Sequence, residues 1–184
     1  MHRRHATVAA CTLTLCVKLA AQPARPVGNS TALVDAAAKG DLLQVRRLLD
    51  AGAPVESRGD TAYSRHATAV LAATQGQHLA VVRLLIAHGA NVNAQDDLQD
   101  SAFLLASASG YTDIVRATLA AGADLASTNR YGGTALIPAA HHGHVETVRE
   151  LLKTKIDIDH VNNLGWTALL EAILCVDVGT ALYQ

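Results

Sequence analysis

The side chains best suited to chemistry are three clustered histidines, His141, His142 and His144, which form the pattern HHxH. Imidazole nitrogens are common ligands of zinc, but a structural zinc site takes about four ligands. No Cys, Asp or Glu lies at ligand spacing from the cluster, and His141 and His142 fall where one helix is expected to turn into the next. The sequence therefore predicts no metal and no cofactor, and leaves a histidine-based metal-binding protein as an alternative.

No other motif in the sequence points to catalysis. The stretch Tyr131-Gly132-Gly133-Thr134 is rich in glycine, but it follows no buried strand and precedes no lysine, as a phosphate-binding loop requires. No G-x-S-x-G motif is present, and Cys175 lies in no catalytic motif. Arg58-Gly59-Asp60 spells an adhesion tripeptide, although Gly-Asp is also common turn material. We expect no enzyme, with adhesion left open as an alternative.

Composition favours thin, closely packed helices and argues against two kinds of partner. The chain has 184 residues, of which 50% are apolar and only 3% aromatic. A formal net charge of −1 does not suit nonspecific binding of nucleic acid or an anionic membrane surface. No uncharged apolar run reaches the roughly 18 residues that a transmembrane helix needs. We expect neither a nucleic-acid partner nor a membrane span.

The first residues are typical of a secretory signal peptide. Residues 1–5 are basic, residues 6–17 are apolar, and Ala20-Ala21 supplies small residues for cleavage. We expect a signal peptide over 1–21, a linker over 22–29, and a mature protein in the periplasm or outside the cell. Cleavage would remove Arg3, Arg4 and Lys18, leaving 12 basic and 16 acidic residues. The alternative is an N-terminal tail on a cytoplasmic protein.

The rest of the chain repeats one unit with a fixed period. Hydroxyl residues recur 33 residues apart, each followed by alanine and then an apolar residue: Thr68, Ser101, Thr134 and Thr167. An earlier copy begins at Thr31, with four extra residues in the loop over 56–67. Such a period is the signature of a repeat array. The predicted repeats cover about 31–60, 61–96, 97–129, 130–162 and, incompletely, 163–184.

Each unit predicts a pair of helices. Its Ser or Thr suits a helix N-cap, and a glycine at Gly40, Gly110 or Gly143 permits the left-handed corner that ends the first helix. The second helix carries apolar residues at i, i+3 and i+4, as in Val82, Leu85 and Ile86. One helix pair cannot bury its apolar faces alone, whereas a stack of pairs buries a continuous core.

Two stretches resemble the ankyrin repeat: TALIPAAHHGHVETVRELL (134–152) and TAVLAATQGQHLAVVRLLIAHGANVNAQDD (68–97). The resemblance covers about 30–173 and implies an all-α ankyrin-repeat solenoid of four complete repeats and a partial fifth, over residues 30–184. The part from Asp96 onward is similar to secreted or periplasmic bacterial ankyrin proteins. The family's motif proline and histidine are replaced by small and aliphatic residues, so its Thr–His hydrogen bonds are expected to be absent.

Three residues depart from the repeated pattern. Pro138 falls within the first turn of a helix, where a missing N–H is expected to cost little. Gln77 takes the place of a corner glycine. Lys155 replaces a glycine that ends the second helix in earlier units, so we expect a helix end about 1 kcal/mol less stable there.

The resemblance implies a partner-binding face rather than an active site. In the ankyrin pattern, variable positions of the loops and first helices project into one concave face. Carried over position by position, the predicted partner-binding residues are Asp97, Leu98, Asp100, Arg130, Tyr131, His141, His142, Asn163, Leu164 and Trp166, with Gln75 and Gly133 beside them. Exposed aromatic and arginine side chains are typical binding hot spots, which favours contact for Arg130 and Tyr131. Trp166 suits contact and lateral packing equally. The expected partner is an unidentified protein.

The fifth unit begins well at residues 162–167, but the chain reads CVDVGTALYQ where its second helix should follow. We expect a truncated array, for which the alternative function is a fragment without independent activity. Apolar surface on the incomplete unit predicts self-association.

Overall fold

A computed structural model describes residues 30–181, and side-chain exposure over 31–174. The predicted signal peptide (1–21) and linker (22–29) lie outside the described residues. The described chain forms four helix pairs and a last single helix: α1 (Ser30–Ala38) with α2 (Leu42–Asp50), α3 (Ala69–Gln75) with α4 (Leu79–Ala87), α5 (Ala102–Ala108) with α6 (Thr112–Ala120), α7 (Leu136–His141) with α8 (Val145–Leu151), and α9 (Ala168–Ala181).

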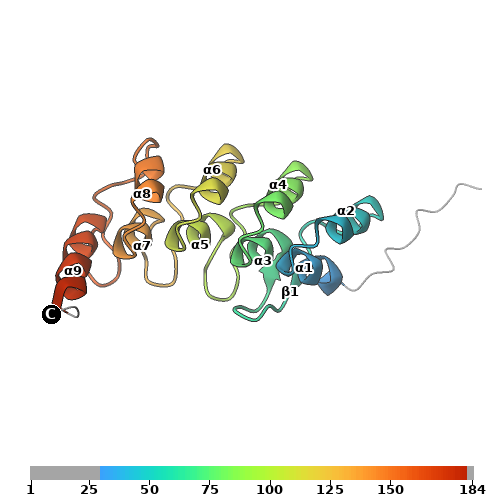
Figure 1. The fold of residues 1–184 in the computed structure, drawn as a ribbon, viewed down its shortest axis with the longest axis horizontal. Helices are drawn as coiled ribbons and strands as arrows, with labels where there is room; N and C mark the ends of the chain where they lie inside the picture. Colours follow the sequence, from blue (N-terminus) through green and yellow to red (C-terminus); the bar gives the residue numbers. More distant parts are fainter. Residues whose placement is uncertain (1–29, 182–184) are drawn as a thin grey trace, which may run out of the picture.

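The helix pairs stack into an elongated array of two rows (Figure 1). The first helices α1, α3, α5, α7 and α9 contact one another in that order, and so do the second helices α2, α4, α6 and α8. A short hairpin joins the first two units, where β1 (Arg58–Gly59) pairs antiparallel with β2 (Ala67–Thr68). The array confirms the predicted all-α solenoid of four complete units and a partial fifth.

Small aliphatic side chains form one continuous core along the array. The first helices α3 and α5, which lie between neighbouring units, are almost wholly buried, and every residue of α3 from Ala69 to Thr74 is buried. The second helices bury one face only, as Val81, Val82 and Leu85 do on α4. This difference follows from position, because a first helix is covered by two neighbouring units and by its own partner helix. Short side chains permit such close packing.

Three of the five predicted N-caps form, whereas Thr31 lies inside α1 and the fourth unit lacks its cap. The hydroxyls of Thr68 and Ser101 accept hydrogen bonds from the N–H three residues later, at 3.4 and 3.2 Å, and Thr167 does the same at 3.3 Å. Thr134 does not cap its helix. Within the part of the chain that the structure describes, its hydroxyl has no partner although Thr134 is only 2% exposed.

Pro138 explains the failed cap. The backbone carbonyl of Ser101 accepts from the N–H of Leu105, four residues on, at 2.9 Å. The residue four positions after Thr134 is Pro138, which has no N–H. The Thr134 carbonyl therefore accepts from Ile137 N instead, at 3.1 Å, and this N–H is no longer free for the hydroxyl. Pro138 does fall within the first turn of α7, as predicted, but the missing N–H is accompanied by the loss of the cap.

The corner glycines adopt the predicted left-handed conformation, but Lys155 does not. Gly40, Gly110 and Gly143 have φ of 71°, 72° and 69°, and Gln77 takes the same corner with φ 57°. Lys155 is not among the described residues with positive φ. The chain leaves α8 through Thr154 instead, whose hydroxyl donates to Leu151 O at 2.6 Å and accepts from the N–H of Ile156 at 3.2 Å. The predicted strain at Lys155 is therefore wrong.

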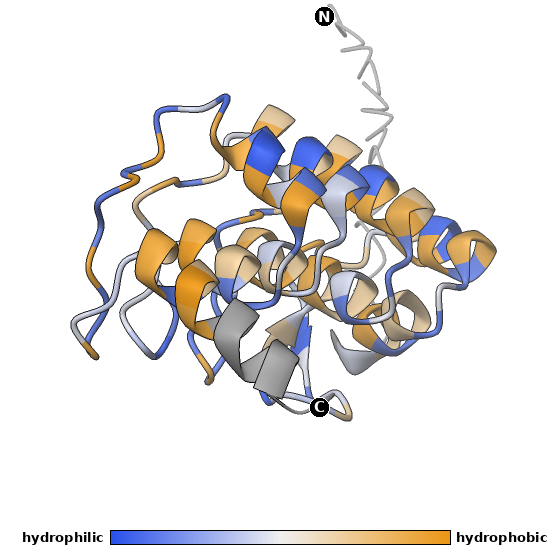
Figure 2. Cartoon of the chain, turned by 60° about the vertical axis from the view of Figure 1, so that its left-hand side comes forward, coloured by the Kyte–Doolittle hydropathy of each residue, from blue (hydrophilic) through white to orange (hydrophobic). Residues whose placement is uncertain are grey.

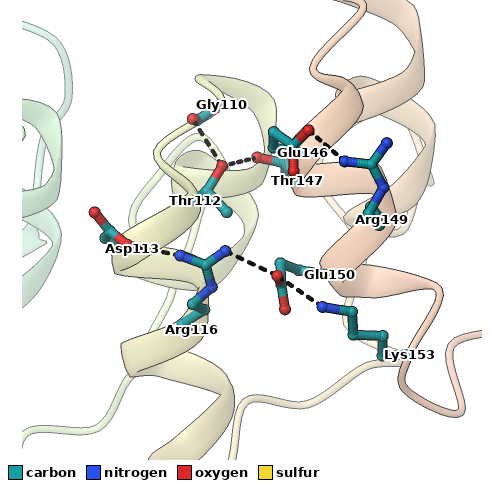
Figure 3. Close-up of polar contacts among 9 residues, drawn as sticks. All are labelled: Gly110, Thr112, Asp113, Arg116, Glu146, Thr147, Arg149, Glu150 and Lys153. Atoms are coloured by element: carbon teal, nitrogen blue, oxygen red, sulfur yellow. Dashed lines mark hydrogen bonds and ion pairs between the residues drawn. The ribbon is translucent and has the colours of Figure 1, made fainter.

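Polar contacts fasten the second helices of the third and fourth units together (Figure 3). The guanidinium of Arg116 on α6 donates to Asp113 on its own helix and to Glu150 on α8, both at 2.8 Å. Lys153 also donates to Glu150, at 2.9 Å. The hydrogen bonds from Arg116 and then Lys153 lower the pKa of Glu150 to about 2. A hydroxyl pair, Thr112 and Thr147, adds a 2.9 Å contact between the same helices.

Candidate functional site

Three of the loops that connect the units are each held by an internal anchor of the same kind. Each begins with an Asp or Asn whose side-chain oxygen accepts hydrogen bonds from the backbone N–H groups two and four residues later. The anchors and their partners are Asp96 with Leu98 and Asp100 (2.8 and 3.0 Å), Asn129 with Tyr131 and Gly133 (3.0 and 3.1 Å), and Asn162 with Leu164 and Trp166 (both 3.0 Å). This Asx geometry fixes the loop tips in the same conformation.

Hydrogen bonds also join each loop to the next. The N–H of Asn163 donates to Tyr131 O at 3.0 Å, and His160 Nε2 donates to Gly132 O at 2.7 Å. In the preceding pair of loops, Gln95 Nε2 donates to Thr128 O at 2.9 Å. Loop tips that lie 33 residues apart in the sequence therefore stand side by side, as the row of loops along one edge of Figure 1 shows.

A hollow of about 420 Å³ lies between these loops and the ends of α7 and α9; we call it the groove. It brings together seven of the ten predicted partner-binding residues: Asp100, Arg130, Tyr131, His141, His142, Leu164 and Trp166. Apolar side chains of Ile137 and Pro138 complete its wall. The groove is thus a shared product of three consecutive units.

A glycine lies at the middle of the loop row that lines the groove. Asp100, Gly133 and Trp166 occupy the same position in three successive loops, and all three line the groove. Gly133 contributes no side chain between a carboxylate on one side and an indole on the other. Gly133 is buried, and a methyl group added there would lie in ordinary van der Waals contact with Asn129 and Ile137, whose nearest atoms would be 3.5 Å away.

Four predicted residues lie outside the groove. The carboxylate of Asp97 is 3.0 Å from His66 Nδ1, near the preceding loop. The side chain of Asn163 packs against Gly132, and Leu98 is half-buried away from the lining. Gln75 donates to Ser64 Oγ at 2.8 Å. These contacts hold loops in place, and the groove itself takes its chemistry from the other residues.

The negative charge of the Asp100 carboxylate in the groove is only partly offset by neighbouring groups. Burial, followed by the nearby charge of Asp96, raises its pKa, while Arg130 lowers it. Its carboxylate accepts no hydrogen bond from any described residue, and its backbone N–H donates to Asp96. The guanidinium of Arg130 lies 4.9 Å over the ring of Tyr131 and is exposed to solvent.

A buried glutamate on α9 joins the histidines and was missed by the sequence analysis. His141 Nδ1 lies 2.8 Å from Glu171 Oε2, and Glu171 is buried. Positions 72, 105 and 138 in the same register are Ala, Leu and Pro. The charged residue at 171, where the earlier units carry uncharged ones, was the sequence feature that could have pointed to this contact. Burial, then His141 and His144, lowers the pKa of His142. Among the described residues, no group of three or more His, Cys, Asp or Glu side chains could hold a metal ion.

The adhesion tripeptide is used inside the fold. Arg58 Nη1 donates to the carbonyl oxygens of His66 and Gln95 at 2.8 and 2.9 Å. Asp60 accepts from the N–H of His66 at 3.2 Å, and Gly59 is buried in β1. Arg58 thus fastens the first hairpin to the next loop, which gives the adhesion alternative no support.

The fold and the groove define a class: a solenoid of helix pairs that presents a row of internally hydrogen-bonded loops. A sequence model of ankyrin repeats matches three overlapping stretches, residues 6–96, 33–129 and 103–183. The chain belongs to the ankyrin repeat family, whose members are generally protein-interaction modules.

Solved structures agree with this assignment. The chain is similar to the crystal structure of an ankyrin repeat domain from Acinetobacter baumannii AYE, with 49% sequence identity and a TM-score of 0.75. The match covers 80% of this chain and 73% of that one. The comparison with curated proteins found no match. No helix of the described region has the length and apolar character needed to cross a bilayer.

Proposed function

We propose that this chain binds a protein partner through the concave face of the ankyrin stack, with the groove as the centre of contact and no catalysis. The observation that carries the proposal is the convergence of Tyr131 and Trp166 on one open hollow in a chain with only 3% aromatic residues. Aromatic and arginine side chains in such hollows dominate binding energy at interfaces. The anchored loops hold these side chains in place before binding, which limits the entropy lost on association.

Site-specific photo-cross-linking tests this proposal. A benzophenone amino acid replaces Leu164 in the groove, or Val145 on the second-helix row as a matched control, because their exposed fractions are nearly equal at 63% and 62%. The full chain is expressed in its native host and irradiated. We expect one discrete adduct from position 164 that is absent from position 145. Equal adducts from both positions would contradict the proposal.

A triple alanine variant at Arg130, Tyr131 and Trp166 supplies the complementary loss of function. We expect the adduct at position 164 to disappear while the far-ultraviolet circular dichroism spectrum is unchanged, since these side chains lie in loops. Persistence of the adduct in this variant would show that the partner binds elsewhere.

We further propose that the partner lies in the periplasm or outside the cell, on the basis of the basic, apolar and small-residue order of residues 1–21. Fractionation of the host, with the N-terminus of the purified protein sequenced, tests this location. An N-terminus at Gln22 in the periplasmic or secreted fraction supports it, and an intact Met1 in the cytoplasm contradicts it.

A second candidate interaction is self-association through α9. Its side chains Leu169, Leu170, Ile173 and Leu174 are all exposed, and Figure 2 shows the described turns of this helix as almost uniformly hydrophobic at one end of the array. A second copy of the chain could cover this face.

A further inference from the structure

We propose that the groove accepts a lysine or arginine side chain, presented by an extended segment of the protein partner. This inference rests on the proposed function and specifies the chemistry of the partner. It is carried by three neighbouring positions of the loop row, all of which line the groove: the carboxylate of Asp100, the glycine at position 133 and the indole of Trp166.

The carboxylate of Asp100 supplies the charge that a basic side chain would meet. It is half-buried and has no hydrogen-bond donor among the described residues. A partly desolvated carboxylate without a donor is costly, and a charge-assisted hydrogen bond from an ammonium or guanidinium group offsets this cost. The raised pKa of Asp100 is consistent with incomplete compensation, although Arg130 acts to lower it.

Arg130 does not already fill this role. Its guanidinium lies over the ring of Tyr131 on the same loop tip, and its exposure leaves its charge well screened by water. No hydrogen bond joins Arg130 to Asp100 in the described region. The side chain instead extends the aromatic surface of Tyr131.

The opposite wall suits the rest of a long basic side chain. Trp166 and Tyr131 both line the groove, and an aromatic face attracts a cation within about 6 Å of its centre. The methylene stem of lysine or arginine also packs well on apolar surface while the charged head reaches a polar partner. Ile137 and Pro138 provide such surface at the groove wall.

The charge balance disfavours an acidic ligand. Asp100 and Glu171 line the groove and Asp96 lies beside it, against the single guanidinium of Arg130. Of the groove histidines, His141 is held by Glu171, and burial lowers the pKa of His142, which favours its uncharged form. A carboxylate ligand would therefore meet an excess of negative charge.

Trp166 makes the inference directly measurable, because it is the only tryptophan in the chain. The full chain is titrated with acetylated, amidated pentapeptides that carry arginine, lysine, glutamine or glutamate between glycines, and the indole N–H resonance and fluorescence of Trp166 are followed. We expect the two basic peptides to bind at least fivefold more tightly than the glutamine peptide, and the glutamate peptide most weakly. Equal binding of all four, tighter binding of the glutamate peptide, or no binding of the basic peptides overturns the inference.

Two variants locate the effect. Asp100→Asn should abolish the preference for basic peptides, whereas Asp35→Asn, which changes an exposed carboxylate on α1, should leave it intact. Gly133→Leu should fill the groove and lower binding of every peptide at least tenfold. Circular dichroism of each variant confirms folding. Preserved basic preference in Asp100→Asn would overturn the assignment of that carboxylate.

These results separate the two proposals. If cross-linking at position 164 succeeds but the peptides show no basic preference, the groove binds a partner of different chemistry and only the further inference fails. If position 164 yields no specific adduct, the proposed function fails whatever the peptides show.

Discussion

Four loop residues at equivalent positions take a left-handed backbone, yet two of them are not glycine. His66, Gln99, Gly132 and Gly165 have φ of 55°, 60°, 72° and 83°, and Gln77 does the same at a helix corner. Residues with a side chain adopt this region at a cost of roughly 1–2 kcal/mol. Gln77 was predicted from the sequence to replace a corner glycine, and strain was predicted at Lys155, where the backbone follows a different path.

Gln77→Gly should therefore stabilise the protein. Relief of the backbone conformation outweighs the added flexibility of the unfolded chain, and we expect the free energy of unfolding to rise by about 0.5–1 kcal/mol. Gly143→Gln makes the reverse change at the equivalent corner, where no atom lies within 4 Å of an added methyl group, and should lower stability by a similar amount. Urea denaturation measures both, and no change in either variant would refute the explanation.

At the scale of single elements, the helix pairs and most of their caps were predictable because one period repeats them, and three of the five predicted N-caps are confirmed. The failure of the cap at Thr134 was not predictable from residue type. It depends on which N–H reaches the Thr134 carbonyl once Pro138 can offer none, and this competition becomes visible only in the hydrogen bonds.

The lost cap at Thr134 predicts that the Thr134→Val substitution changes the free energy of unfolding in opposite directions with and without Pro138. Thr134→Val removes a buried hydroxyl without a partner, so it should raise the free energy of unfolding by about 1 kcal/mol. In the Pro138→Ala background, the restored N–H at position 138 donates to the Thr134 carbonyl. The N–H of Ile137 is then free to donate to the Thr134 hydroxyl, which caps the helix. The same Thr134→Val change should then cost about 1 kcal/mol.

Thr68→Val is the matched control for this cycle, since the Thr68 hydroxyl does cap its helix. It should be destabilising in both backgrounds. If Thr134→Val has the same effect with and without Pro138, the explanation of the lost cap is wrong.

The link between α6 and α8 should weaken in acid. Because hydrogen bonds from Arg116 and Lys153 lower the pKa of Glu150 from 4.5 to about 2, its contribution is fully present above about pH 5 and is lost as the pH falls towards 2. Glu150→Gln should lower the Tm at pH 7 but leave it close to that of the unchanged protein near pH 2. Thermal melts across this range test the prediction, and a Tm difference that is independent of pH would contradict it.

At the scale of the whole molecule, the solenoid could be predicted from the 33-residue period of the sequence, whereas the groove could not. The period placed Asp100, Gly133 and Trp166 in one row, and seven of the ten predicted residues indeed line one hollow. The sequence could not show that Asp97 turns back to His66, since four extra residues alter the preceding loop. Nor did it reveal Glu171, whose charge is unexpected only when the registers of the first helices are compared.

The exposed face of α9 predicts self-association of the 184-residue chain. Leu169 is 71% exposed, and its apolar neighbours on the helix are exposed as well, so a second copy would remove this surface from water. We expect the weight-average mass in sedimentation equilibrium to rise with concentration. Leu169→Glu combined with Ile173→Glu should restore a monomer, and a monomer at every concentration without these changes would refute the prediction.

The shared loop anchor has a consequence for how this protein could acquire new partners. Asp96, Asn129 and Asn162 each hold their loop through backbone N–H groups, so the conformation of a tip does not depend on the side chains displayed there. Residues such as Arg130 and Tyr131 could be exchanged by mutation while the backbone remains the same. If the loop tips bind the partner as proposed, specificity and folding are encoded by different residues of one loop, and selection can change the first without disturbing the second.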